Sequence, residues 1–258
     1  MALEARGVAR RFSSVTVVRD INLRVDFGQV VGYLGPNGSG KTVTARMLTG
    51  LLEPTAGQIL YDGRDIQEDL VAFHQRLGYV PEEPHLYSFL SGREHLELVG
   101  RLRRLPGSLL TRKISALLEL LGLARAADQP ISGYSKGMKQ KILIIAALLH
   151  DPDLLIFDEP ESGLDLTAGL VLRHLVPALA ARGKAILYSS HVLDAVEKLC
   201  SRVIIIHRGS ILANAPVEEL RGMLESTSSL EDVIAQLVET EDPGRTARDI
   251  AEVAALRA

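Results

Sequence analysis

Short runs of apolar residues recur along the chain, most of them separated by segments with helical periodicity. The clearest runs are Val30–Leu34, Leu77–Val80, Leu154–Phe157, Ala185–Tyr188 and Val203–Ile206. Their hydrophobicity is continuous rather than alternating, which is typical of strands that are buried on both faces. Such strands belong to a parallel sheet that lies between layers of helices, so the pattern predicts an α/β fold.

Two other segments alternate apolar with polar residues. Ile21–Val25 does so near the N-terminus, and Gln58–Gly63 resembles one arm of a hairpin. Half-exposed strands with this alternation form antiparallel sheets. We therefore expect a small antiparallel β subdomain packed on the α/β core.

The strand signals disappear between Pro84 and about Gln129. Apolar residues stand there at helical spacing, for example Ile114, Leu117 and Leu121. This pattern predicts an α-helical subdomain, at about residues 84–150, inserted into the α/β core.

A second helical pattern begins after about residue 215. Ser229–Asp232 resembles a capping box ahead of the apolar residues Val233, Ile234 and Leu237. The expected domains are therefore a main domain over residues 1–215 and a C-terminal helical tail over residues 216–258.

The net charge and the cysteine content bear on two questions: whether the chain binds nucleic acid and whether it can form a disulfide. The formal net charge of −3 argues against a surface whose main task is to neutralise the phosphates of a nucleic acid. Cys200 is the only cysteine, so no intrachain disulfide can form. A single thiol in an amphipathic stretch is expected to be a small core residue.

No segment of the chain has the pattern of a membrane anchor. Met1–Arg6 lacks the apolar core of a secretory signal. The longest apolar runs, such as Ile142–Leu149, fall well short of the roughly 20 residues that cross a bilayer. We expect a cytoplasmic protein, and if it serves a membrane, another chain supplies the span.

A glycine-rich segment follows the apolar run Val30–Leu34 and opens a helical stretch. It consists of Gly35, Pro36, Asn37, Gly38, Ser39, Gly40, Lys41 and Thr42. Glycines let backbone N–H groups close around a phosphate, and a helix N-terminus adds positive potential. Lys41 is expected to reach the β- and γ-phosphates of ATP, and Thr42 to bind Mg²⁺. A plain glycine-rich turn is the alternative, but the strand–loop–helix setting favours phosphate binding.

Two carboxylates follow another apolar run, Leu154–Phe157. Ligands of open α/β sheets gather at such strand ends, so Asp158 is expected to hold Mg²⁺ directly or through water. Glu159 is expected to be the base that polarises the attacking water. Two acids at a strand end are commonly just solvated, and only the glycine-rich loop upstream favours the catalytic interpretation.

Further short motifs follow these two in a recognisable order. The full series is Gly35–Thr42, Tyr134–Gln140, Asp158–Glu159, Ser162–Asp165 and His191. Over about residues 3–215 it resembles the ATP-binding subunits of ABC transporters. The resemblance implies an ATPase with a P-loop core, a mainly parallel sheet, an antiparallel β subdomain and an inserted helical subdomain. The main domain over residues 1–215 is then a nucleotide-binding domain.

The resemblance also implies a head-to-tail homodimer with two ATP molecules held between the subunits. The signature residues of one subunit would contact the ATP of the other; they are Tyr134, Ser135, Lys136, Gly137 and Met138. Ser135 and the backbone of Gly137 would touch the γ-phosphate. Ser135 also precedes a long apolar helix and could be its N-cap, and the two roles are compatible.

Three single residues take their expected roles from the resemblance. His191 would sense the γ-phosphate and hold Glu159, although a lone histidine is more often structural. Asp165, in the loop Ser162, Gly163, Leu164 and Asp165, would couple the two sites, or it could cap a helix. Phe12 would stack on adenine, or it could be a core residue.

The sequence departs from the family pattern at a few positions. Glu82 stands where most relatives carry a glutamine that binds Mg²⁺. The glutamate adds a negative charge near the phosphates, so we expect an altered dependence of activity on the metal. Val43 replaces a threonine that bonds the α-phosphate, so one hydrogen bond of about 0.5–1.5 kcal/mol is missing. Lys136 and Met138 resemble the signature of an exporter branch.

The sequence thus predicts an ATPase that uses ATP and Mg²⁺, pairs with a second copy of itself and drives export through a separate membrane-spanning subunit. Its expected place is the inner face of the cell membrane, and nucleic acid is not an expected partner. Two other interpretations stay open: a soluble ATPase of the same family, or an ATP sensor without turnover.

Overall fold

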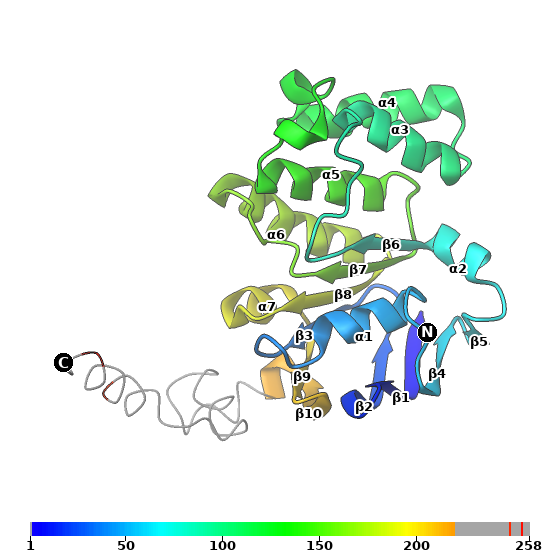
Figure 1. The fold of residues 1–258 in the computed structure, drawn as a ribbon, viewed down its shortest axis with the longest axis vertical. Coiled ribbons are helices and arrows are strands. Elements are labelled where there is room, and N and C mark those ends of the chain that lie inside the picture. Colours follow the sequence, from blue (N-terminus) through cyan, green and yellow to red (C-terminus); the bar gives the residue numbers. More distant parts are fainter. Residues whose placement is uncertain (1, 220–247, 249–253, 255–258) are drawn as a thin grey trace. The chain divides into compact units, whose positions relative to one another are not determined.

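The computed structural model describes residues 2–219, 248 and 254. The chain divides into two compact units, Met1–Ala215 and Pro216–Ala258, and the first holds nearly all of the described residues. Its element order can be followed in Figure 1. The predicted capping box at Ser229 and the helix after it lie outside the described residues.

A six-stranded sheet forms the centre of the first unit, in the order β10-β9-β3-β8-β7-β6. Its strands are β3 (Val30–Leu34), β6 (Leu77–Val80), β7 (Leu154–Asp158), β8 (Ala185–Ser190), β9 (Arg202–His207) and β10 (Ser210–Pro216). Strands β9, β3, β8, β7 and β6 pair in parallel. The five apolar runs that opened the sequence analysis are therefore neighbouring strands, as predicted.

A second sheet is antiparallel and has the order β2-β1-β4-β5. It consists of β1 (Leu3–Phe12), β2 (Val15–Val25), β4 (Ala56–Tyr61) and β5 (Arg64–Asp65). The register runs from Leu3 opposite Val25 to Phe12 opposite Val15, so β1 and β2 form a hairpin. The predicted antiparallel subdomain is confirmed.

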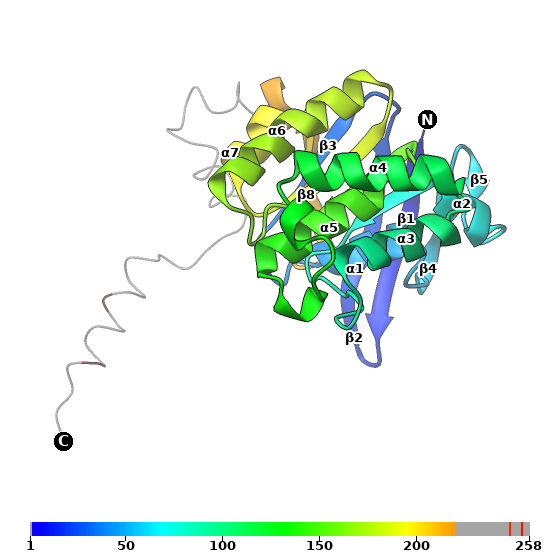
Figure 2. The ribbon, with the colours of Figure 1, turned by 90° about the horizontal axis from the view of Figure 1, so that it is seen from above.

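Helices cover the sheets and form a separate layer. They are α1 (Lys41–Leu48), α2 (Leu70–Arg76), α3 (Gly92–Leu102), α4 (Gly107–Leu120), α5 (Lys136–Leu148), α6 (Leu166–Ala181) and α7 (Leu193–Leu199), with 3-10 turns at Ala124–Ala126 and Ile131–Gly133. Helices α3, α4 and α5 pack on one another, and in Figures 1 and 2 α3 and α4 lie on the side of α5 away from the sheet. This layer is the predicted helical insertion.

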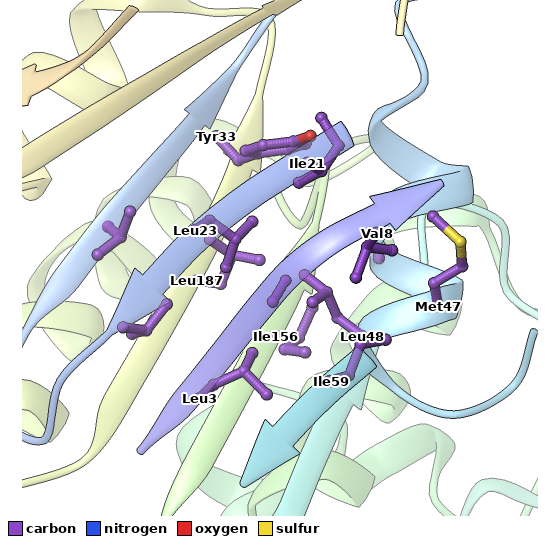
Figure 3. Packing of buried hydrophobic residues seen from close by; sticks show 14 of the residues in the cluster. Leu3, Val8, Ile21, Leu23, Tyr33, Met47, Leu48, Ile59, Ile156 and Leu187 are labelled. Atoms are coloured by element: carbon purple, nitrogen blue, oxygen red, sulfur yellow. The ribbon is translucent and has the colours of Figure 1, made fainter. Parts of the chain in front are cut away.

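The two faces of the central sheet have different partners. Alternate residues such as Val31, Ile156 and Leu187 join the antiparallel sheet and α1 in one buried cluster, part of which is shown in Figure 3. The residues between them face the other way, where α6 and α7 contact β3 and β8. Both faces are thus covered, which is why these strands carry no polar alternation.

The helical layer has a core of its own. Leu96, Ile114, Leu118, Ile142 and Ile145 are buried in one cluster that joins α3, α4 and α5. A capping box fixes the start of α3: the Ser91 hydroxyl accepts from Glu94 N at 3.2 Å, and Ser91 N donates to the Glu94 carboxylate at 2.8 Å.

Cys200 is buried, as the sequence suggested, and burial raises the pKa of its thiol to about 12. Within the part of the chain that the structure describes, no helix combines the length and the apolar character needed to cross a bilayer.

Candidate active site

The glycine-rich loop connects β3 to α1, and its glycines are required by the backbone path. Gly38 and Gly40 have φ angles of 77° and 106°, a region that other residues rarely adopt. A Cβ on Gly35 would collide with the carbonyl oxygen of Ile206 and lie 2.7 Å from the Ser39 hydroxyl. The sequence therefore turns sharply from the strand into a helix whose first residue is Lys41.

Lys41 is 6% exposed and its ammonium group is surrounded by oxygen atoms. It donates to the carbonyl of Gly35 at 2.7 Å and to that of Pro36 at 3.3 Å. The Glu159 carboxylate lies 3.3 Å away on its other side. The cation is thus held at the mouth of the loop, where a phosphate group would compete with these oxygens for it.

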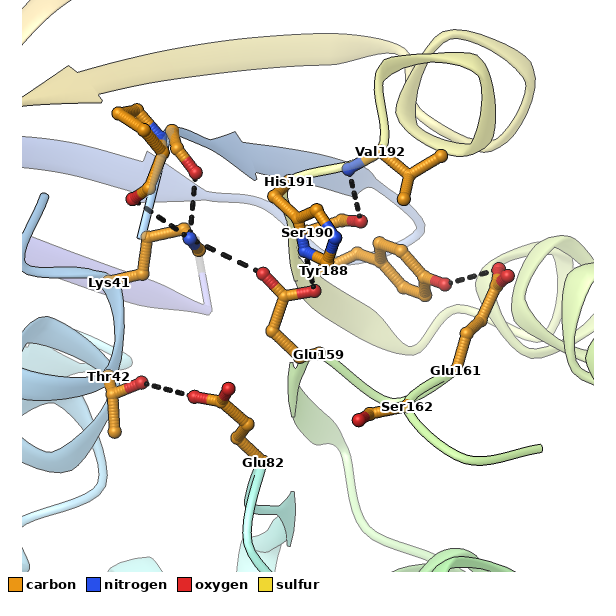
Figure 4. A network of polar contacts seen from close by, with 12 residues as sticks. Lys41, Thr42, Glu82, Glu159, Glu161, Ser162, Tyr188, Ser190, His191 and Val192 are labelled. Atoms are coloured by element: carbon orange, nitrogen blue, oxygen red, sulfur yellow. Dashed lines mark hydrogen bonds and ion pairs between the residues drawn. The ribbon is translucent and has the colours of Figure 1, made fainter. Parts of the chain in front are cut away.

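Glu159 and His191 come from neighbouring parallel strands. Asp158 at the end of β7 pairs with Ser189 of β8, and Glu159 N donates to the carbonyl of Ser189 at 3.1 Å. The Glu159 carboxylate and His191 Nδ1 are 2.8 Å apart, as Figure 4 shows. One carboxylate of 9% exposure therefore contacts both Lys41 and His191.

The residues expected to hold Mg²⁺ also meet here. The Thr42 hydroxyl donates to the Glu82 carboxylate at 3.2 Å (Figure 4). Asp158 is fully buried, and no hydrogen bond of ordinary geometry reaches its oxygens, although the Thr42 and Ser189 hydroxyls are close enough to favour its charged form. Burial, with the negative charges of Glu82 and Glu159 nearby, raises the pKa of Asp158. Such a carboxylate is costly without a cation, so these oxygen donors fit Mg²⁺.

The signature residues lie elsewhere on the same subunit. Ser135 is the N-cap of α5 and its hydroxyl accepts from Met138 N at 3.2 Å. Tyr134 is buried, and its hydroxyl donates to the carbonyl of Ala126 at 2.5 Å. Among the described residues, no hydrogen bond or ion pair joins Tyr134–Met138 to the phosphate loop.

The loop Ser162–Asp165 lies between Glu159 and α6. Asp165 caps α6, accepting from Ala168 N at 2.8 Å, and this hydrogen bond, with that from Lys141, holds the pKa of Asp165 below its usual range. Lys136 Nζ donates to the Ser162 hydroxyl at 2.7 Å. A Cβ on Gly137 would lie 2.5 Å from the carbonyl oxygen of Gly163. The signature and this loop therefore touch within one subunit.

Phe12 is the predicted site residue that the structure leaves apart. It is 42% exposed at the end of β1, and the Arg10 guanidinium carbon lies 4.6 Å from its ring centroid. A cavity of about 290 Å³ beside the loop is lined by Val17, Asn37, Gly38, Gly40, Lys41, Thr42, Val43 and Glu82. Val17, and not Phe12, is the residue of the β1–β2 hairpin that lines this cavity. Stacking of adenine on Phe12 therefore stays a prediction.

Three polar residues near the site had no signal in the sequence. The Tyr188 hydroxyl donates to Glu161 at 2.8 Å, and the Arg173 guanidinium donates to the same carboxylate at 3.0 and 2.7 Å. In the sequence, Glu161 is a third acidic residue shortly after Asp158 and Glu159, and no pattern marks it as functional. Tyr188 belongs to an apolar strand and Arg173 to a helix, so pattern alone treats both as ordinary structural residues.

Comparison with known proteins identifies the family. The family model described as "ABC transporter" matches residues 18–162, which is more than half of the chain. The chain is an ATP-binding subunit of the ABC transporter family. Its enzymatic activity is that of an ABC transporter ATPase.

Individual relatives of the subunit agree with this. It is 39% identical to the ABC transporter ATP-binding protein NatA of Bacillus subtilis, over 82% of the subunit and 88% of that protein. It is 37% identical to the Nod factor export ATP-binding protein I of Cupriavidus pinatubonensis, over 84% and 67%. The Enterococcus faecalis protein named bacitracin transport ATP-binding protein BcrA is 34% identical, over 84% and 70%.

A solved structure gives the same answer for the fold. An ATP-binding subunit of an ABC transporter superimposes with a TM-score of 0.85 at 32% identity, over 92% of the subunit and 99% of that chain. The predicted fold class is thereby confirmed.

Replacement of Lys41 tests the phosphate loop. Lys41→Ala removes charge-assisted hydrogen bonds worth about 1.5–3 kcal/mol, so we expect a fluorescent ATP analogue to bind about tenfold to a hundredfold more weakly. Lys113→Ala is the matched control, because Lys113 caps a distant carbonyl, that of Leu149, at 2.8 Å. Equal affinity of Lys41→Ala and wild type for the analogue would refute the assignment of the loop.

Proposed function

We propose that two copies of this subunit close head-to-tail around two molecules of Mg·ATP, and that their ATP hydrolysis drives transport, in the export direction, through a separate membrane-spanning subunit. One observation carries the dimer: Ser135 presents the N-terminus of α5, yet among the described residues it has no hydrogen bond to its own phosphate loop. A helix N-terminus is suited to an anion, and a second copy would supply one as the γ-phosphate of its ATP.

The charged groups of the site suit phosphoryl transfer. Lys41 neutralises phosphate oxygens, while Glu159 orients the attacking water and accepts its proton. His191 holds the Glu159 carboxylate at 2.8 Å and can sense the γ-phosphate with the rest of its ring, which is exposed. Mg²⁺, when bound by Thr42, Asp158 and Glu82, neutralises charge on the phosphates.

The dimer gives ATP a mechanical role. ATP binds between the two copies and so favours the closed dimer by mass action, while hydrolysis and release of phosphate remove that preference. Closure brings the signature of each copy to the other's phosphate loop. A membrane partner attached to both copies would then be moved once in each cycle.

A groove beside the helical layer is the proposed docking place for the membrane partner. Its volume is about 330 Å³, and it is lined by Thr49, Leu51, His74, Leu77, Tyr79, His85, His95, Val99, Arg103, Leu143, Ala146 and Ala147. Its lining includes Leu51, an exposed apolar side chain, so a protein partner that covers the groove would bury apolar surface there.

Export is supported by the name of one relative, which is for Nod factor export, and transport by the name of another, which is for bacitracin transport. The lysine and methionine of the signature, Lys136 and Met138, agree with that branch. Since the cargo does not touch the nucleotide-binding subunits of this family, its identity depends on the partner.

The dimer is tested by blocking hydrolysis. For Glu159→Gln we expect sedimentation velocity to show a monomer without nucleotide and a dimer with Mg·ATP, because loss of the base traps the closed state. Addition of Ser135→Arg to this variant is expected to abolish the dimer while ATP still binds. A monomer under both conditions, with binding intact, would contradict the proposed closure and favour an ATP sensor.

The docking groove is tested by charging its rim. Leu51 is 62% exposed, so Leu51→Glu leaves the fold and ATPase activity intact but is expected to move the tagged protein from the membrane fraction of the source cells to the soluble fraction. Leu120→Glu is the matched control, at 77% exposure outside the groove. If the wild-type protein is itself soluble in these cells, the family activity is uncoupled from membranes and the transport proposal fails.

The extra carboxylate at the metal site is tested separately. Glu82→Gln keeps the size of the side chain and its oxygen but removes one negative charge near Asp158. We expect the Mg²⁺ concentration for half-maximal ATPase activity to rise about fivefold, which corresponds to roughly 1 kcal/mol. An unchanged Mg²⁺ dependence would mean that Glu82 does not contribute to the metal site.

A further inference from the structure

The catalytic carboxylate is followed by a loop that is held on both sides. Glu159 itself has a φ angle of +49°, so the chain leaves β7 in a conformation that its neighbours must stabilise. On one side the loop is held by α5, where Gln140 Nε2 donates to the carbonyl of Pro160 at 3.1 Å and Gln140 is fully buried.

The other side is held by Glu161, two residues after the catalytic carboxylate. Its oxygens accept from the Tyr188 hydroxyl at 2.8 Å and from the Arg173 guanidinium at 3.0 and 2.7 Å. Tyr188 is 1% exposed, and its ring packs 6.3 Å from that of Phe157 in the adjacent strand. Burial, with the Glu161 charge beside it, raises the pKa of Tyr188, so its hydroxyl stays protonated and donates.

These contacts join the same two segments that carry Glu159 and His191. Tyr188 lies on β8, three residues before His191, and Glu161 lies in the chain that leaves β7. Arg173 Nη1 is also 4.0 Å from Asp194, three residues after His191. Figure 4 shows the Tyr188–Glu161 hydrogen bond beside the Glu159–His191 contact.

We propose that Glu161 is a positioning residue for ATP hydrolysis: held by Tyr188 and Arg173, it fixes the distance between the Glu159 and His191 side chains. This rests on the proposed roles of Glu159 and His191. A free loop would let the carboxylate rotate away from the water that it must orient, and misplacement by about 1 Å can cost a hundredfold in rate. Both Glu161 oxygens are bonded by Arg173 and Tyr188, so Glu161 acts through Glu159 and not on the phosphates.

Steady-state ATPase kinetics of the full chain test the proposal. We expect Glu161→Ala to lower kcat about tenfold, Tyr188→Phe about threefold to tenfold, and Glu161→Gln about threefold, because the amide oxygen can still accept a hydrogen bond. KM for ATP is expected to stay within twofold of wild type, and Tm within about 3 °C. Combining Glu161→Ala with Tyr188→Phe is expected to lower kcat no further than Glu161→Ala alone.

A matched pair of arginine variants controls for the loss of an ion pair. The Arg173 and Arg93 side chains are each 32% exposed, and the shortest ion pair of each is 2.7 Å long, although Arg173 also bonds the second oxygen of Glu161. Arg173→Gln is expected to lower kcat about threefold to tenfold, by loss of a charged hydrogen bond. Arg93→Gln, whose partner is Asp128 in the helical layer, is expected to leave kcat unchanged.

Two results would overturn the proposal. One is a kcat of Glu161→Ala and Tyr188→Phe within twofold of wild type; the other is a fall in kcat that is matched by a rise in KM and a fall in Tm, which indicates a structural role only. If Glu161→Ala does not fold, Tyr188→Phe decides, because it removes one hydroxyl and keeps the ring. An unchanged kcat in Glu159→Gln would instead refute the role of Glu159 as catalytic base. That result concerns the proposed function, and the Glu161 variants would still show whether Glu161 affects kcat.

Discussion

The parallel pairing of β3, β8 and β7 is the constraint on which the site depends. Parallel neighbours end at the same edge of a sheet, so the phosphate loop after β3, the carboxylates after β7 and His191 after β8 are brought within hydrogen-bond reach. The Lys41–Glu159 and Glu159–His191 contacts are its direct result. A register shift of one residue in β7 would turn Asp158 to the other face of the sheet and would move Glu159 with it.

The same edge concentrates negative charge in a place with little water. Burial, with the charges of Glu82 and Glu159 nearby, raises the pKa of Asp158, which is fully buried. Lys41 pairs with Glu159, so the negative charge of Asp158 has no cation beside it in the described part of the chain. A group of this kind is tolerated in a stable fold when its task is to bind a cation, and the Thr42 hydroxyl beside Glu82 completes a set of oxygen donors.

Much of the fold could be predicted because the strands of the central sheet and the helical layer have local signals. The bounds of β3 and β6 match the apolar runs, and β7 and β8 extend past theirs by the polar residues that form the site. The phosphate loop and the Glu159–His191 pair followed from motif order. Contacts of Glu161 could not be predicted, because Tyr188 and Arg173 lie 27 and 12 residues away and have no periodicity that marks them as partners. The path of the β1–β2 hairpin could not be predicted either, and it places Val17 rather than Phe12 in the lining of the cavity.

The loop after Glu159 is also bonded to the helix that the signature opens. Lys136 donates to Ser162, Lys141 to Asp165 and Gln140 to the carbonyl of Pro160, so one face of α5 is held against the loop that begins at Glu159. Glu161 ties the other side of the loop to β8, so a continuous set of side-chain contacts runs from α5 through this loop to the strand that precedes His191. The place of Glu159 relative to His191 therefore depends on these contacts as well as on the pairing of the strands.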